Sequence, residues 1–234
     1  MRELFNQSYQ EYIEYMSKNV EDFWTHVGFL SRRNQIMSVI DSLNDDFNFE
    51  KLITLETGGS QNLRDGIFGL FMGFATVKTN GTMMAVDTDR NVVDRSYELF
   101  KTVIPNLHYE IYEEDSIKFL LELKEIPNLV HLDSWDLNLH DPLPSSLHGW
   151  REFTAIENKM PSGSIIIIDD NYIGGTWVDW QYADGRIDRI SNTYPMTGKG
   201  AIIYHYVIGG TSDWKLIGSQ YNVYNNIKII IQKR

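Results

Sequence analysis

The chain has 234 residues, of which 42% are hydrophobic and none is cysteine, and its formal net charge at pH 7 is −11. The length suits one domain with a substantial core, and the lack of cysteine excludes disulfides, thiolate catalysis and cysteine-bound metal. The negative charge disfavours nucleic acid as a partner. The start of the chain has acids and tyrosines where a signal peptide would need an apolar core, and no apolar run approaches the roughly 18 residues of a membrane span. We therefore expect one cytoplasmic domain, residues 1–234, that binds a small molecule. Assembly into a homo-oligomer is compatible with this expectation.

The first part of the chain is predicted to be helical. Large apolar residues recur at spacings of three and four over residues 4–30, which predicts one helix or two consecutive helices, and the same pattern predicts another over residues 36–43. Packing against the domain is the simplest role, although helices rich in tyrosine and tryptophan also suit a lid over a site. We expect residues 1–48 to form a helical lid or cover.

The middle of the chain alternates between short apolar runs and helical patterns. Strands are predicted at residues 51–55, 82–86, 108–112, 128–132 and 165–168, and helices at residues 63–77, 92–103, 116–124 and 147–158. Strands that alternate with helices are typical of an α/β protein with a doubly wound, mostly parallel sheet.

The last third of the chain has weaker patterns. Residues 172–197 are aromatic and lack a clear period, which predicts a long loop that either walls the substrate or covers the domain. Residues 199–208 fit either a strand or a helix, and the glycine pair at 209–210 and the need for a crossover favour the helix. Two strand-like runs, residues 214–224 and 227–232, are joined across Asn225 and Asn226, which predicts an antiparallel hairpin.

Two apolar runs end abruptly in acidic and amide side chains. Residues 128–136 read NLVHLDSWD, and residues 164–171 read SIIIIDDN. Buried parallel strands deliver polar groups to the carboxyl edge of a sheet in this way. The pattern predicts a cluster of oxygen ligands at that edge.

Three further motifs lie where strands are predicted to end. LETGGSQN, at residues 55–62, is a glycine turn that lets a ligand approach the backbone, although it also suits a structural turn. Asp87 follows the second strand, where doubly wound folds hold a ribose diol, while Asp89 is a better helix cap. In EEDS, residues 113–116, Asp115 or Ser116 caps the next helix or reaches an adenine. Together these motifs indicate a nucleoside ligand.

In their order ETGGS, AVD, EEDS, HLDSWD and IIIIDDN, these motifs resemble the class I S-adenosylmethionine-dependent methyltransferases, and among them the metal-dependent O-methyltransferases that act on catechols and sugars. The resemblance covers roughly residues 33–234 and implies a seven-stranded Rossmann-like methyltransferase sheet that ends in the hairpin. It implies that Glu56, Gly58 and Ser60 surround the methionine part of S-adenosylmethionine and that Asp87 binds the ribose. The other implied cofactor contacts are Asp115 and Ser116 at the adenine, with Asp133 beside the cofactor.

The same resemblance implies a divalent cation, Mg²⁺ or another such as Mn²⁺ or Ca²⁺. Its ligands would be Asp133, Asp170 and Asn171, with Asp169 in place of Asn171 if the chain follows the sugar-modifying relatives. A hard cation bound by oxygen orients a hydroxyl and lowers its pKa, so that the hydroxyl becomes a nucleophile.

The chain departs from these relatives at two positions. Asp136 stands where they carry a lysine or histidine base, so either Asp136 or His140 is the candidate base here. Asn62 stands where they often keep a glycine. The leading hypothesis is a metal-assisted O-methyltransferase for a small-molecule or sugar hydroxyl. The alternatives are a metal-independent N- or carboxyl-methyltransferase and a nucleoside-binding module without catalysis.

Overall fold

A computed structural model describes residues 1–25, 27–63, 66–173, 176–181, 187–192, 196–221 and 226–234. The helices are α1 (Arg2–Asn19), α2 (Val27–Ser42), α3 (Ile67–Val77), α4 (Arg90–Val103), α5 (Ser116–Glu122), α6 (Leu143–Ile156) and α7 (Ala201–Ile208). The strands are β1 (Ile53–Thr57), β2 (Thr82–Asp87), β3 (His108–Glu113), β4 (Leu129–Leu132), β5 (Ile165–Ile173), β6 (Thr176–Gln181), β7 (Ile187–Asn192), β8 (Met196–Gly198), β9 (Trp214–Tyr221) and β10 (Asn226–Lys233). Within these ranges no helix is both long and apolar enough to cross a membrane.

The main sheet has the order β3-β2-β1-β4-β5-β10-β9, and β8 pairs with β5 away from this path. Strands β1 to β5 are mutually parallel, and β10 runs antiparallel to both β5 and β9. The order in which the chain adds strands reverses between β1 and β4, so the carboxyl ends of these two parallel strands flank the crevice in which doubly wound sheets bind ligands. The predicted α/β fold, with its C-terminal antiparallel hairpin, is confirmed.

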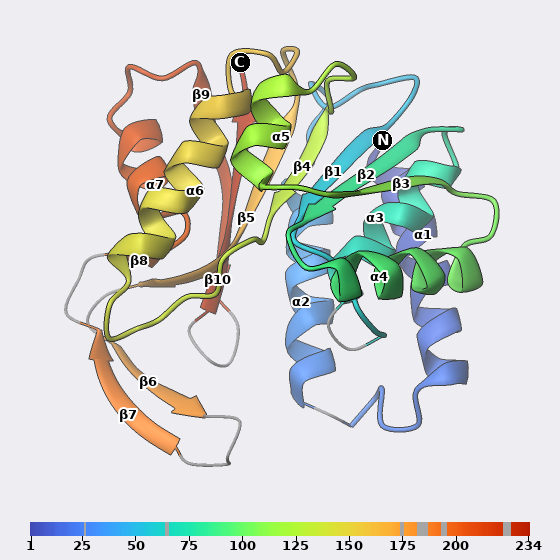
Figure 1. Cartoon of the computed structure of the whole chain (residues 1–234), viewed down its shortest axis with the longest axis horizontal. Coiled ribbons are helices and arrows are strands. Elements are labelled where there is room, and N and C mark those ends of the chain that lie inside the picture. Colours follow the sequence, from blue (N-terminus) through green and yellow to red (C-terminus); the bar gives the residue numbers. More distant parts are fainter. Residues whose placement is uncertain (26, 64–65, 174–175, 182–186, 193–195, 222–225) are drawn as a thin grey trace.

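Helices cover both faces of the sheet (Figure 1). Neighbouring residues of β5 point to opposite faces, as the period of a strand requires: Ile165 and Ile167 pack in one core cluster with residues of α1 to α4, and Ile166 and Ile168 pack in the other with residues of α5 to α7. A strand buried on both faces needs an unbroken apolar run. This explains why the IIII of β5 shows no alternation.

The N-terminal pattern corresponds to two helices. The first, α1, packs against α3, with the rings of Phe5 and Phe71 5.7 Å apart and an ion pair of 2.6 Å between Glu11 and Lys78. Because α3 is enclosed by β1, β2 and α1, nearly all of its residues are buried and apolar. The first helix thus covers the core, whereas α2 extends toward the carboxyl edge of the sheet and brings Arg32 there.

The prediction of a loop over residues 172–197 is wrong for the parts that the structure describes. Strand β5 continues to Ile173, β6 and β7 form a two-stranded antiparallel sheet, and β8 adds an eighth strand to the main sheet, where seven were predicted. Thr, Trp, Val and Ile in β6 and β7 favour extended backbone, which outweighs the missing alternation. Figure 1 shows this small sheet beside the carboxyl end of β5, apart from the main sheet.

The predicted helix near the C-terminus is α7, and the predicted hairpin is β9 with β10. The turn that was expected across Asn225 and Asn226 cannot be compared, because Asn225 lies outside the described residues; Asn226 is the first residue of β10.

The cap of α4 provides a test of local stability. The side chain of Asp89 accepts a hydrogen bond of 2.8 Å from the backbone N–H of Asn91, which otherwise has no partner within the helix. We expect Asp89→Ala to lower the free energy of unfolding by about 1 kcal/mol in urea denaturation. Asp89→Ser should recover most of the loss, and a full loss with serine would contradict a capping role.

Candidate functional site

A cavity of about 560 Å³ opens at the carboxyl edge of the sheet, next to the ends of β1, β2 and β4. Every residue that was predicted to hold the cofactor lies on its wall, although these residues come from separate parts of the chain. They are Glu56, Gly58, Ser60, Asp87, Asp115, Ser116 and Asp133. The sheet therefore brings the three nucleoside motifs and the end of β4 to one place.

The glycine turn after β1 is held close to β2 and β4. Gly58 has φ +93°, and a Cβ there would lie 3.0 Å from the carbonyl oxygen of Asp133. At Gly59 a Cβ would lie 2.3 Å from the Val92 side chain. Neither position accepts a side chain without displacement of its neighbours, and both glycines line the cavity, so the turn brings backbone rather than side chains to its wall.

Asp87 orders this turn. One carboxylate oxygen accepts the backbone N–H of Gly59 at 3.0 Å, and the other accepts the N–H of Asp89 at 2.8 Å. Asp87 is not the cap of α4, because Asp89 has that role, as was expected. Each carboxylate oxygen can accept more than one hydrogen bond, so both remain able to accept a hydroxyl from a ligand.

The EEDS motif has a structural role as well as a place at the cavity. Asp115 caps α5 by accepting the N–H of Lys118 at 2.9 Å. The side chain of Ser116 lies 3.2 Å from Nε2 of His148 in α6. Both residues remain on the cavity wall, so capping and ligand contact are compatible here.

The acidic residues that follow β4 and those within β5 are paired with cations from elsewhere in the chain. Nζ of Lys199 lies 2.7 Å from Oδ1 of Asp133 and 3.2 Å from Oδ2 of Asp170. The Lys199 side chain is 2% exposed, whereas Asp133 and Asp170 are 34% and 28% exposed and line the cavity. Burial by itself would lower the pKa of Lys199, but the two carboxylates outweigh it and raise the pKa.

Asp169 points away from the cavity into a buried charge cluster. Its Oδ2 lies 2.6 Å from Nζ of Lys228 in β10 and 3.1 Å from Nη1 of Arg32 in α2. Burial opposes the charge on Asp169, yet these two cations hold its pKa well below the usual range. Beside it, His131 lies 3.1 Å from Glu56 and 3.2 Å from Lys228.

Asn171 is also turned away from the cavity. Its amide nitrogen donates to the carbonyl oxygens of Ile168 and Asp169, both at 2.9 Å, and its Oδ1 accepts the N–H of Gly200 at 2.6 Å. The side chain thereby fixes the chain that follows β8 against the end of β5. This is a structural role.

The residues present do not fit a divalent cation at the predicted place. Three carboxylates, of Asp133, Asp169 and Asp170, already meet three cations, Lys199, Lys228 and Arg32. An added Mg²⁺ between Asp133 and Asp170 would stand against the Lys199 ammonium in a partly desolvated site, where like charges repel strongly.

A different triad, Glu56, His131 and Asp133, has ligand atoms within 4.8 Å of one another. The two ring nitrogens of His131 already face Glu56 and Lys228, so this group is equally committed to contacts within the chain.

The two candidate bases lie in different places. Asp136 is on the cavity wall, whereas His140 is exposed and does not line the cavity. Trp135, which also lines the cavity, stacks on His148 with ring centroids 5.1 Å apart. Trp135 and Asp170 have φ of +64° and +51°, a conformation that non-glycine residues rarely adopt and that is concentrated at functional sites.

Several residues of the site were not predicted. Lys199, Lys228 and Arg32 stand outside every motif, because nothing in a linear pattern shows that a lysine will be buried. Glu152 is fully buried and accepts a hydrogen bond of 2.6 Å from Ser134. Glu152 follows His148 by four residues in α6, and this spacing is the sequence signal that could have placed the two side chains on one helix face.

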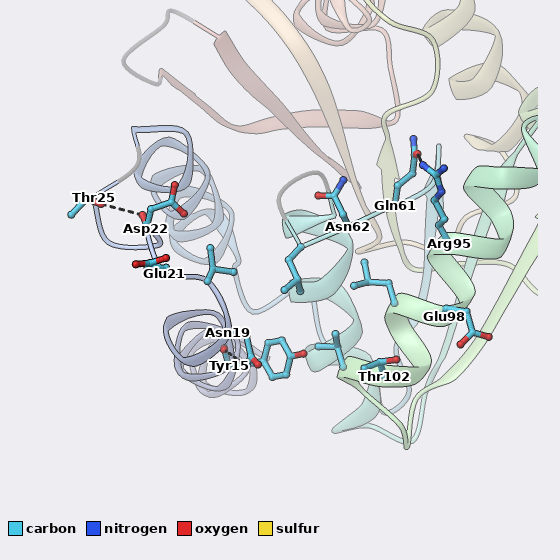
Figure 2. Close-up of a pocket in the computed structure, with 14 residues that line it drawn as sticks. Tyr15, Asn19, Glu21, Asp22, Thr25, Gln61, Asn62, Arg95, Glu98 and Thr102 are labelled. Atoms are coloured by element: carbon cyan, nitrogen blue, oxygen red, sulfur yellow. Dashed lines mark hydrogen bonds between the residues drawn. The ribbon is translucent and has the colours of Figure 1, made fainter. Parts of the chain in front are cut away.

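A second, larger hollow of about 1140 Å³ lies between the end of α1 and α4 (Figure 2). Gln61 lines both hollows and accepts a hydrogen bond of 3.3 Å from Arg95. Apart from Gln61 and Asn62 in the glycine turn, the motif residues lie elsewhere. We therefore place the candidate site in the smaller cavity.

Comparison of the sequence with protein-family models and with curated proteins finds no match. Solved structures do match in fold. TrmN from Thermus thermophilus is 8% identical with a TM-score of 0.53, and the match covers 88% of this chain but only 49% of that one, so this chain spans about half its length.

Two further solved structures match this chain with comparable TM-scores and sequence identities. TehB from Haemophilus influenzae is 10% identical with a TM-score of 0.51 and coverages of 89% and 67%, and an rRNA methylase from Streptococcus thermophilus is 10% identical with a TM-score of 0.50 and coverages of 82% and 92%. The fold is the Rossmann-like methyltransferase fold.

Proposed function

We propose that this chain is an S-adenosylmethionine-dependent methyltransferase that methylates a hydroxyl group of a small molecule. The observation that supports the proposal is that one cavity at the carboxyl edge of the sheet has the glycine turn, Asp87 and Asp115 together on its wall. In a fold of this kind, a glycine turn and an acid at the next strand end are suited to the methionine and ribose parts of one nucleoside.

The chemistry would be an in-line displacement at the sulfonium methyl group. The acceptor oxygen forms a bond to the methyl carbon while the carbon–sulfur bond breaks, and S-adenosylhomocysteine leaves as a neutral thioether. The hydroxyl proton must go to a base, and the carboxylates of Asp133, Asp136 and Asp170 all lie on the cavity wall. Asp136 is our candidate base, since Asp133 and Asp170 are paired with Lys199.

The proposal contains no step through a divalent cation. The resemblance to metal-dependent enzymes implies one, but the carboxylates that would bind it are already neutralised by cations of the chain.

An amine is the second candidate acceptor. A wall of carboxylates without a metal can orient an ammonium group and accept its proton, which favours N-methylation over the methylation of an anionic carboxylate. Nucleic acid is a less suitable acceptor, although one similar structure is an rRNA methylase, because the formal charge of this chain is −11.

Transfer of a labelled methyl group tests the proposal. The full chain is incubated with methyl-labelled S-adenosylmethionine and separate pools of phenols, sugars, amines and carboxylic acids. We expect label in the phenol or sugar pool. Label only in the amine pool would support the second candidate, and cofactor binding without transfer to any pool would favour a binding module.

A further inference from the structure

The Lys199 ammonium lies between the carboxylates of Asp133 and Asp170. The resemblance to metal-dependent methyltransferases implies that these two carboxylates would bind the divalent cation. The ammonium is within 2.7 Å of Asp133 and 3.2 Å of Asp170, and these acids separate it from the cavity. We propose that Lys199 is a positioning residue that takes the place of the divalent cation, so that this protein keeps the carboxylate pair but needs no metal. The inference rests on the proposed function, because a cation is expected between these two acids only if the cavity is a methyltransferase site.

The backbone on both sides of Lys199 is clamped. Gly198 accepts a hydrogen bond of 2.7 Å from Ser146 in α6, and Gly200 donates one of 2.6 Å to Asn171. At Gly149 a Cβ would lie 2.4 Å from the carbonyl oxygen of Lys199, so α6 packs directly on this segment. A lysine on a flexible loop could leave the acid pair, but this one is held.

Lys199 is the cation that the ion pairs assign to Asp133 and Asp170, so one lysine stands where one divalent cation would bind. Lys199 serves Asp133 and Asp170, while Lys228 and Arg32 serve Asp169. Removing the Lys199 charge would leave two carboxylates facing each other across the space of one ammonium group. Hard divalent cations prefer oxygen ligands arranged in this way.

The consequence is a testable exchange of cations. Wild-type protein should not bind Mn²⁺ stoichiometrically, whereas Lys199→Ala should create a site for one ion formed by Asp133 and Asp170. Calorimetric titration with MnCl₂, without any methyl donor, measures this directly. Because the donor is absent, failure of the proposed methyl transfer does not affect the result.

Three further proteins complete the experiment. Lys215→Ala removes a lysine from a surface ion pair with Asp46 and serves as the matched control, with no expected gain of Mn²⁺ binding. Lys199→Ala combined with Asp133→Asn should lose the gained site. Lys199→Arg keeps a cation there and should gain none.

Melting temperature provides a second readout. Lys199→Ala should melt below wild type in EDTA and recover at least part of the loss in MnCl₂, and wild type should not respond. One Mn²⁺ per wild-type chain that Asp133→Asn abolishes would overturn the inference, and this arm remains decisive if Lys199→Ala does not fold. A folded Lys199→Ala without Mn²⁺ binding would overturn it too.

Discussion

Replacement of Asp87 by alanine is expected to weaken the binding of S-adenosylhomocysteine by about 10- to 100-fold. The ribose hydroxyls would lose the carboxylate that is proposed to accept their hydrogen bonds. A hydrogen bond to a charged group contributes about 1.5 to 3 kcal/mol, and about 1.4 kcal/mol corresponds to a tenfold change in affinity. The substitution also removes the acceptor for the backbone N–H of Gly59, which lines the cavity. Isothermal titration calorimetry measures the change.

The matched control for Asp87 is Asp94→Ala. Asp94 is an exposed acid on α4 that forms an ion pair of 2.9 Å with Arg90 and does not line the cavity. The affinity of the Asp94→Ala protein for S-adenosylhomocysteine should equal that of wild type. An Asp87→Ala protein with wild-type affinity and an intact fold would remove the ribose assignment.

Replacement of Asp169 by asparagine is expected to lower the free energy of unfolding by about 3 to 5 kcal/mol, because it leaves the buried Lys228 and the partly exposed Arg32 without their carboxylate. Denaturation in urea at pH 7 measures the loss. Asp46→Asn, which breaks the exposed pair of 2.9 Å with Lys215, should cost less than about 1 kcal/mol. Equal losses of unfolding free energy in the two variants would contradict the claim that the ion pairs of Asp169 stabilise the fold more than an exposed pair does.

The difference between wild type and Asp169→Asn should depend on pH. The pKa of Asp169 is lower in the folded protein than in the unfolded chain, so its stabilisation is fully present above the unfolded pKa of about 3.9 and is lost as the pH falls through the folded pKa. The gap between the two unfolding free energies should therefore narrow below about pH 4. A constant gap from pH 7 to pH 3 would show that charge is not the cause.

Local patterns were enough to predict most of the sheet. The run IIII of β5 and the motifs that end β1, β2 and β4 depend on burial and on the period of neighbouring residues, which are readable along the chain. The same property explains why Glu56, Asp87 and Asp115 were expected together, since parallel strands end at one edge.

The charge cluster could not be read in this way. Lys199, Lys228 and Arg32 come from three distant elements, and only the folded sheet shows that each meets a carboxylate. Asp169, Asp170 and Asn171 were treated as one ligand group, but β5 is irregular at this point, since Asp170 has φ +51° and the pairing of β5 with β10 shifts register beside it. In the structure only Asp170 of the three reaches the cavity wall. Residues 172–197 were misjudged because their strands lack a simple alternation.

A crystal structure with S-adenosylhomocysteine tests the central claim most directly. We predict density for one molecule in the 560 Å³ cavity, with the ribose at Asp87, the adenine beside Asp115 and Ser116, and the homocysteine at Gly58. Density in the hollow between α1 and α4 (Figure 2), or none at saturating ligand, would contradict the account.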